Sequence, residues 1–204
     1  AVAIPFSIFL LRVKARCSPP PSKQYINASP IWECSFLLGE SLTSNNGVYL
    51  VPAFVGLGAP YWDPDCRGAL FGMTRNTGPA EITKATLESV CYQTSDLLNA
   101  ISKDLGESKL SAIRVDGGMA ASNWTMQMLS DLVELPVDRP KNLETTALGA
   151  AYLAGMQVGF YPSMDEFSET WQSESQFNSK MTDEHRQRKL SGWKDAVKRT
   201  LSNN

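Results

Sequence analysis

The sequence predicts an α/β domain with a largely parallel or mixed sheet. Beyond Gly47, short apolar stretches typical of strands alternate with longer stretches whose apolar residues recur every three or four positions. Strand, helix, strand, helix is the order found in α/β domains. The 204 residues are 43% hydrophobic and 9% aromatic, which is enough apolar material to bury one core of this size. Intrinsic disorder is therefore disfavoured.

The N-terminal part of the chain differs from the rest. Residues 1–11 form an apolar run that is too short to span a membrane and has its positive charges on the wrong side for a signal peptide, so we expect a buried strand or helix. The three prolines of residues 17–22 predict a linker or loop. Because the chain starts with Ala1, we expect it to be part of a longer protein. We expect an irregular segment over residues 1–46 and one domain over residues 47–204.

The domain is expected to open with two strands and a long helix. Residues 48–55 and 68–73 are rich in β-branched and aromatic residues and are bounded by glycine and proline, which predicts a hairpin-like pair. Pro79 predicts the first turn of a helix, because its missing N–H costs nothing there, and Glu81 complements the helix dipole. The apolar spacing continues until Gly106, where we expect the helix to end.

Two short strands and three helices are expected in the second half. Residues 112–115 and 136–140 predict extended stretches, with a helix over residues 122–135 between them. The small residues of the next helix, residues 144–159, indicate close backbone approach to a sheet or helix, or a hinge. Residues 182–201 place apolar side chains on one face of a charged helix, which we expect to dock as the closing element.

Composition disfavours several function classes. The 19 basic and 21 acidic residues give a formal net charge of −2, so no field of one sign exists to recruit nucleic acid or an anionic membrane. We therefore expect neither as a partner. The four cysteines contain no Cys-x-x-Cys pair and the single histidine lies far from them in sequence, which argues against a structural zinc site. So few thiols also fit a reducing, cytoplasmic location.

Motifs for a nicotinamide cofactor or a P-loop are not found in the sequence. Residues 56–61 resemble the start of a dinucleotide fingerprint, but Tyr61 stands where Gly or Ala is required and Pro60 prevents the helix that should follow. An NAD-dependent oxidoreductase is therefore a weak alternative. Asp63 and Asp65 lie in a proline-rich turn, where we expect their carboxylates to accept backbone N–H groups and not to bind a metal.

The most informative local sequence is the turn after the strand at residues 112–115. Asp116, Gly117 and Gly118 end this strand and lead into the next helix. Two glycines let a ligand approach the main chain at the carboxyl edge of the sheet, where α/β folds bind ligands. The helix N-terminus behind them suits a phosphate, or a ribose and base edge. Two interpretations stay open here: a nucleotide seat, or only a tight strand-to-helix turn.

Longer stretches of the domain follow the pattern of a known family. Residues 68–73 and, after seven residues, 81–88 match its C-terminal signature throughout, and residues 52–68 match its glycerol-phosphorylating members. Further matches are residues 114–118, 144–151 and 192–199. Over about three quarters of its length, residues 47–201, the chain resembles the FGGY carbohydrate kinases, which phosphorylate glycerol and sugars.

The resemblance implies an actin-like, ribonuclease-H-like ATPase domain with a mixed sheet flanked by helices, the second of two domains that close over a cleft. It implies that ATP with Mg²⁺ phosphorylates glycerol to glycerol 3-phosphate. Gly117 and Gly118 would contact the nucleotide through their main chain. The adenine would be contacted by Ser122 or by Asn123, because Ser122 occupies the position where many members have Asn and Asn123 follows it. Both residues stay candidates.

The resemblance also implies a missing half. In the family, the glycerol-binding residues, the β- and γ-phosphate loops and the catalytic Asp lie on the first domain, and nothing in this chain resembles them. We therefore assign no catalytic residue and no metal ligand here, and expect weak or no activity from the isolated chain, since phosphoryl transfer depends on positioning and charge stabilisation. The complete enzyme can form a homo-oligomer. The alternative is a non-catalytic nucleotide-binding or oligomerisation module derived from a carbohydrate kinase.

Overall fold

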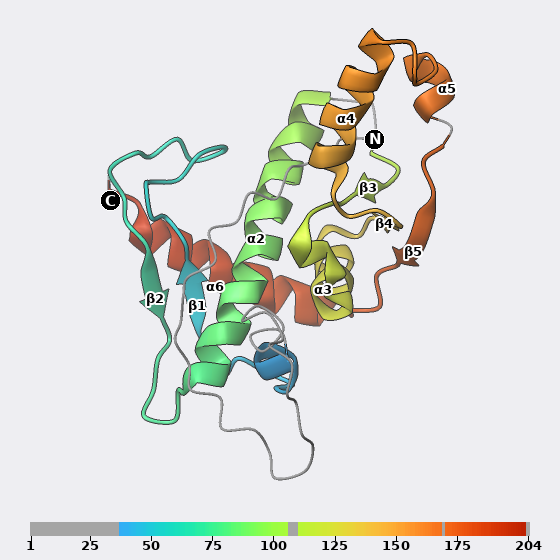
Figure 1. Cartoon of the computed structure of the whole chain (residues 1–204). Helices are drawn as coiled ribbons and strands as arrows, with labels where there is room; N and C mark the ends of the chain where they lie inside the picture. Colours follow the sequence, from blue (N-terminus) through green and yellow to red (C-terminus); the bar gives the residue numbers. More distant parts are fainter. Residues whose placement is uncertain (1–36, 106–109, 169, 203–204) are drawn as a thin grey trace, which may run out of the picture. The chain divides into compact units, whose positions relative to one another are not determined.

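The computed structural model describes residues 37–105, 110–168 and 170–202 (Figure 1). The expectations for residues 1–11, for residues 17–22 and for Gly106 lie outside these ranges. The chain divides into two compact units, and each is described by itself. Of the described residues, the sheet unit contains Leu105–Lys180, and the hairpin unit combines residues 37–104 with those from Met181 onward.

Among its described residues, the hairpin unit has two short strands and two long helices. Residues 37–40, within the segment expected to be irregular, are helical. Strand β1 (Tyr49–Val51) pairs antiparallel with β2 (Ala69–Phe71). Helix α2 spans Pro79–Leu105, and helix α6 spans Asp183–Thr200 and contacts β1. The hairpin and both helices confirm the predictions from sequence. At the start of α2, the Glu81 carboxylate accepts the Gly78 N–H at 2.9 Å, as suits an acidic residue in a first turn.

The turn between the two strands uses Asp63 as an acceptor for the backbone. One carboxylate oxygen accepts the N–H groups of Asp65 and Cys66, each at 3.0 Å, and the other accepts the N–H of Ser202 at 2.7 Å. These hydrogen bonds, that from Ser202 foremost, lower the pKa of the Asp63 carboxyl. The prediction that this side chain satisfies backbone N–H groups is confirmed.

Gly192 allows α6 to approach β1 closely. A Cβ at this position would meet the ring of Tyr49, whose hydroxyl donates to the Lys189 carbonyl at 3.3 Å. We expect Gly192→Ala to destabilise the protein by about 1 kcal/mol or more, because overpacking, which costs about 1–3 kcal/mol, exceeds the gain of about 1 kcal/mol in helix propensity. Urea unfolding measures the difference against Ser191→Ala, an exposed neighbour on α6. Equal stabilities of the two variants would contradict the close packing.

The sheet unit contains a mixed three-stranded sheet with strand order β3-β4-β5. Strand β3 (Ile113–Arg114) runs parallel to β4 (Val137–Pro140), and β5 (Ser173–Phe177) runs antiparallel to β4. A short 3₁₀ helix, η1 (Gly118–Ala121), follows β3. The α-helices are α3 (Asn123–Val133), α4 (Thr145–Gln157) and α5 (Met164–Ser168). The predicted strands and helices of this region are confirmed, whereas β5, α5 and η1 were not predicted.

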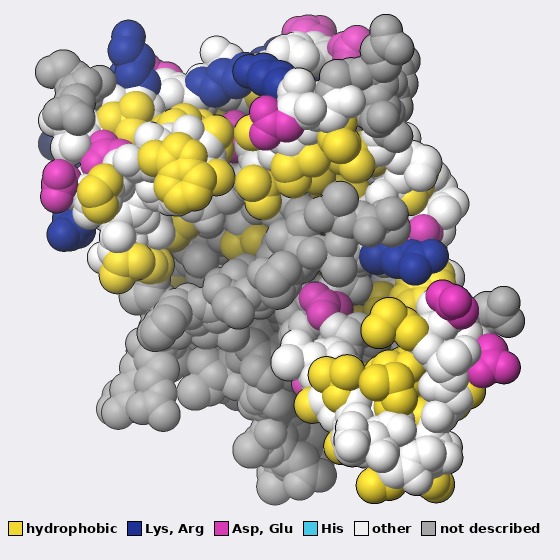
Figure 2. Space-filling view, turned by 90° about the horizontal axis from the view of Figure 1, so that it is seen from above, with side chains coloured by type: hydrophobic (Ala, Val, Ile, Leu, Met, Phe, Trp, Pro, Cys, Tyr) yellow, Lys and Arg dark blue, Asp and Glu magenta, His cyan; other side chains and the backbone are white. Residues whose placement is uncertain are grey.

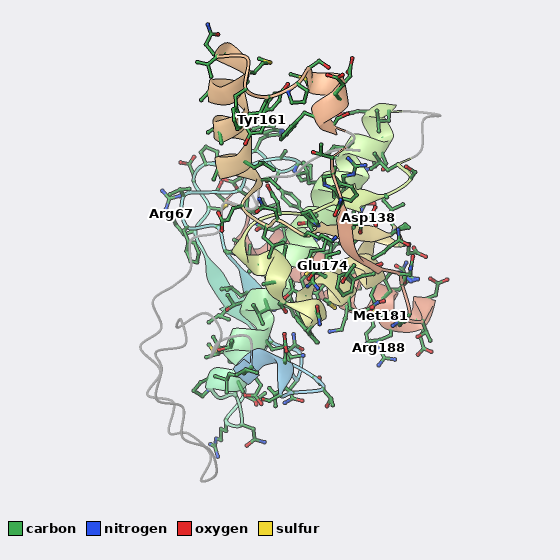
Figure 3. All side chains as sticks on the ribbon, turned by 45° about the vertical axis from the view of Figure 1, so that its right-hand side comes forward. Arg67, Asp138, Tyr161, Glu174, Met181 and Arg188 are labelled. Atoms are coloured by element: carbon green, nitrogen blue, oxygen red, sulfur yellow. The ribbon has the colours of Figure 1, made fainter. Side chains whose placement is uncertain are left out.

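Helix α4 is the element whose surroundings differ from expectation. Among the described residues, nothing lies within 4 Å of the position that a Cβ at Gly149 would take, so the expected close approach is not met there. The close approach occurs at Gly155 instead, where a Cβ would meet the ring of Tyr161, which lies beside α4 (Figure 3).

Figure 2 shows hydrophobic side chains at the surface. Exposed large apolar residues of α4 and the segment after it are Leu153, Met156, Val158, Phe160 and Met164.

Within the described ranges, no helix combines the length and the apolar composition needed to cross a lipid bilayer.

Candidate nucleotide site

A turn made of Asp116, Gly117 and Gly118 joins β3 to η1, and we call it the glycine turn. Gly117 has φ 82° and ψ 173°, a conformation that only glycine adopts without strain. Its N–H donates to the Leu143 carbonyl at 2.9 Å. The Asp116 carboxylate accepts the hydroxyl of Thr145, the first residue of α4. The glycine turn is thus tied to the segment that leads from β4 into α4.

Gly118 leaves bare main chain at the surface. The residue is exposed, and a Cβ added to it would have no neighbour within 4 Å. Within residues 37–105, 110–168 and 170–202, no hydrogen-bond acceptor is found for its N–H. The two glycines therefore differ in role. Gly117 is required by the backbone conformation, whereas Gly118 leaves space that a ligand can fill.

The structure separates the two candidates for the adenine contact. Ser122 is only 5% exposed, and its hydroxyl oxygen accepts the Thr125 N–H at 3.1 Å and the Thr125 hydroxyl at 3.0 Å. Ser122 is thereby the N-cap of α3. Asn123, the first residue of α3, is exposed. Of the two, only the Asn123 side chain is available to a ligand.

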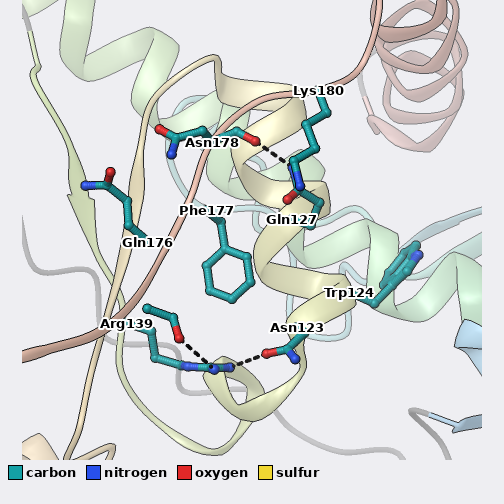
Figure 4. A pocket seen from close by; sticks show the side chains of 9 residues that line it. Asn123, Trp124, Gln127, Arg139, Gln176, Phe177, Asn178 and Lys180 are labelled. Carbon is teal, nitrogen blue, oxygen red and sulfur yellow. Dashed lines mark hydrogen bonds between the residues drawn. The ribbon is translucent and has the colours of Figure 1, made fainter.

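Asn123 lies at one end of a groove between α3 and the strands β4 and β5 (Figure 4). This α3 groove has a volume of about 620 Å³, and neither Gly117 nor Gly118 lines it. Its side chains are polar and aromatic, with two cations and no carboxylate among them. The lining residues are Asn123, Trp124, Gln127, Arg139, Ser175, Gln176, Phe177, Asn178 and Lys180.

Arg139 connects the α3 groove to the segment behind the glycine turn. It comes from β4 and is 8% exposed. Its guanidinium contacts the last residues of η1, the first residue of α3 and the edge strand β5, where Glu174 lies (Figures 3 and 4). Sequence reasoning did not select Arg139. The available signal was an arginine in a short extended stretch, two residues after Val137 and so on the same face of the strand.

Comparison with known proteins relates the chain to carbohydrate kinases. The family model described as "FGGY family of carbohydrate kinases, C-terminal domain" matches residues 28–158. The glycerol kinase of Sinorhizobium fredii is 59% identical over 165 residues, which are 80% of this chain and 33% of that protein. The glycerol kinase of Rhizobium rhizogenes is 58% identical over 167 residues, 81% of this chain and 34% of that protein. The chain thus spans about one third of the length of these curated relatives.

Solved structures of carbohydrate kinases share the fold. The crystal structure of Plasmodium falciparum glycerol kinase with ADP matches with a TM-score of 0.72 at 38% identity, over 84% of this chain and 34% of that one. A ligand-bound xylulose kinase from Lactobacillus acidophilus matches with a TM-score of 0.68 at 20% identity, over 82% and 34% of the two chains, which shows the fold alone. The predicted actin-like α/β fold with a mixed sheet is confirmed. The chain therefore belongs to the FGGY family of carbohydrate kinases and carries its C-terminal domain.

Proposed function

We propose that this chain is the nucleotide-side domain, over residues 47–204, of a kinase that transfers the γ-phosphate of ATP to glycerol and forms glycerol 3-phosphate. The observation that carries the proposal is the open main chain at Gly118, at the carboxyl end of β3. The names of the relatives and the ADP in the Plasmodium structure support a nucleotide and an alcohol acceptor. The buried free thiol of Cys66 is consistent with a reducing, cytoplasmic location.

Four residues would form the nucleotide seat, and they have different roles. Gly117 shapes the turn, and Gly118 would present its main chain to the adenosine. Ser122 would support the seat only as the cap of α3, because its hydroxyl oxygen is already used as an acceptor. Asn123 would supply the side-chain contact with the base. When bound, ATP supplies the phosphoryl group, and these residues hold and orient its adenosine part.

The acceptor side of the reaction is assigned to a part of the protein beyond this chain. Among the described residues, no group of three or more His, Cys, Asp or Glu side chains is placed to hold a metal ion. Glycerol, the catalytic Asp and the phosphate loops belong to the first domain that the family resemblance implies. The isolated chain is therefore expected to bind nucleotide without appreciable turnover. A complete enzyme can also form a homo-oligomer.

Substitution of Gly118 tests the nucleotide seat directly. Gly118→Val places a β-branched side chain where the main chain would contact adenosine, so we expect the affinity for ADP to fall by at least about tenfold, the effect of losing about 1.4 kcal/mol of binding free energy. The thermal unfolding temperature should change little, because the Cβ enters open space. Titration of the ¹⁵N-labelled chain with ADP, followed by two-dimensional NMR, measures the affinity.

Two further variants make this test quantitative. Gly118→Ala adds a single carbon and should have an intermediate effect. Ala154→Val, on the exposed surface of α4, adds the same two methyl groups away from the glycine turn and should leave ADP affinity unchanged. If Gly118→Val binds ADP as tightly as the unmodified chain, Gly118 is not part of the seat and the proposal fails.

A further inference from the structure

Arg139 donates hydrogen bonds to three residues of the segment that follows the glycine turn, where η1 ends and α3 begins. Its Nη1 donates to the carbonyls of Ala120 and Ala121, at 3.1 and 3.3 Å, and to the Asn123 Oδ1 at 2.8 Å. One nitrogen thereby holds both residues that end η1 and the residue that starts α3. Because Arg139 belongs to β4, which pairs with β3, the strand that leads into the glycine turn and the helix that leaves it are fixed to the same sheet.

The remaining nitrogens hold the guanidinium in place. Nε donates to Glu174 at 2.8 Å and Nη2 to the Ser175 hydroxyl at 3.4 Å, both on β5, while the guanidinium carbon lies 5.3 Å from the centre of the Phe177 ring. The Arg139 side chain is 10% exposed and that of Glu174 is 51% exposed. The planar fork of arginine makes this set of contacts possible, and the single ammonium of lysine cannot reproduce it.

The bond from Arg139 determines which end of the Asn123 carboxamide remains available. An Asn side chain has one acceptor oxygen and one donor NH₂ group. The oxygen accepts from Arg139, and no acceptor is found for Nδ2 in the described part of the chain. Since Asn123 is exposed, the Nδ2 donor is the group that it presents to a ligand. Adenine offers ring nitrogens that accept such a hydrogen bond.

We propose that Arg139 is a positioning residue of the nucleotide seat: it fixes the η1–α3 junction behind Gly118 and orients the Asn123 carboxamide so that Nδ2 donates to the base. This inference rests on the proposed function. Arg139 acts through the main chain of the junction and through Asn123, without touching the nucleotide itself.

A double-mutant cycle on the whole chain separates positioning from general stabilisation. We expect Arg139→Lys to weaken ADP binding by at least about fivefold, since the hydrogen bonds of the guanidinium to the junction are lost. In the Asn123→Ala background the same substitution should weaken binding by a clearly smaller factor, because the part of its effect that passes through Asn123 is already lost and only the part that passes through the main chain of the junction remains. The matched control is Glu174→Gln, which removes the negative charge of the half-exposed partner but keeps an oxygen that can accept from Nε, and it should change ADP affinity by less than about twofold.

The orientation of the carboxamide has its own test, which also serves if Arg139→Lys does not fold. In Asn123→Asp the carboxylate still accepts from Arg139 but offers only acceptors to the base. Affinity for adenosine, which carries no phosphate charge, should fall at least as far as in Asn123→Ala. Retained adenosine affinity in Asn123→Asp overturns the orientation.

The outcomes distinguish this inference from the proposed function. If Gly118→Val weakens ADP binding while Arg139→Lys does not, the positioning role of Arg139 is wrong and the seat stands. If the effects of Arg139→Lys and Asn123→Ala simply multiply, Arg139 does not orient the Asn123 carboxamide, and that part of the inference is wrong. If the NMR spectrum of the unmodified chain does not change on addition of ADP, the proposed function itself is wrong. It is also wrong if Gly118→Val binds ADP as tightly as the unmodified chain.

Discussion

Trp193→Ala is expected to destabilise the hairpin unit by about 3–5 kcal/mol, as is typical of removing a large buried aromatic side chain. Trp193 is 0% exposed, and its ring stacks on Tyr92 of α2 with the ring centres 5.2 Å apart. The truncation leaves a cavity between α6 and α2. It also removes the indole N–H that donates to the Asp96 carboxylate at 2.6 Å. Urea unfolding followed by far-ultraviolet circular dichroism measures the loss of stability.

Trp193→Phe divides this effect into packing and hydrogen bonding. The phenyl ring keeps most of the contact with Tyr92 but has no donor for Asp96, which retains the Tyr61 hydroxyl at 2.7 Å. Burial and, next, this hydrogen bond raise the pKa of Tyr61, so its hydroxyl stays protonated and remains a donor at neutral pH. We expect a smaller loss, about 1–3 kcal/mol. Lys194→Ala, exposed on the same helix, should stay within about 0.5 kcal/mol. A loss as large as that of Trp193→Ala would show that the burial of Trp193 is not the origin of its effect.

The elements that sequence reasoning located are those with local signals. Pro79 and Glu81 mark the start of α2 by their position alone, and the helix does begin at Pro79. Strand β5 lacks such a signal, because its sequence, Ser-Glu-Ser-Gln-Phe, is polar and largely exposed at the edge of the sheet. A strand of this kind forms by pairing with β4 and has no apolar alternation that would identify it.

In the candidate site as well, the parts with a local sequence signal could be predicted, and the parts that depend on contacts distant in sequence could not. The glycine turn could be predicted because a strand that runs into two glycines before a helix is visible in the sequence. Which of Ser122 and Asn123 can contact the adenine could not be predicted, because it depends on which residue is the N-cap of α3. Arg139 contacts Asn123 and Glu174, which lie 16 and 35 residues away in sequence. Only the pairing of β4 and β5 brings these three side chains together.

Lys189→Met is expected to destabilise the hairpin unit by about 3–5 kcal/mol, because it leaves a buried carboxylate without its ion pair. Glu88 on α2 is 0% exposed, and the Lys189 Nζ lies 3.0 Å from its Oε1. Asn45 and Tyr92 also donate to this carboxylate, at 2.8 and 3.2 Å, but neither carries a charge. Burial lowers the pKa of the nearby Lys84, whose Nζ donates to the Gly39 carbonyl at 3.3 Å.

The cause of this loss is tested by removing the negative charge as well. Glu88→Gln keeps an oxygen that accepts the hydrogen bond from Asn45 but needs no cation, so Glu88→Gln combined with Lys189→Met should be more stable than Lys189→Met alone. Arg188→Met is the matched control, because Arg188 pairs with Glu184 at the surface and its removal should cost about 1 kcal/mol or less. If the combined variant unfolds at the same urea concentration as Lys189→Met, the loss arises from the aliphatic part of the lysine side chain, and the charge on Glu88 is not its origin.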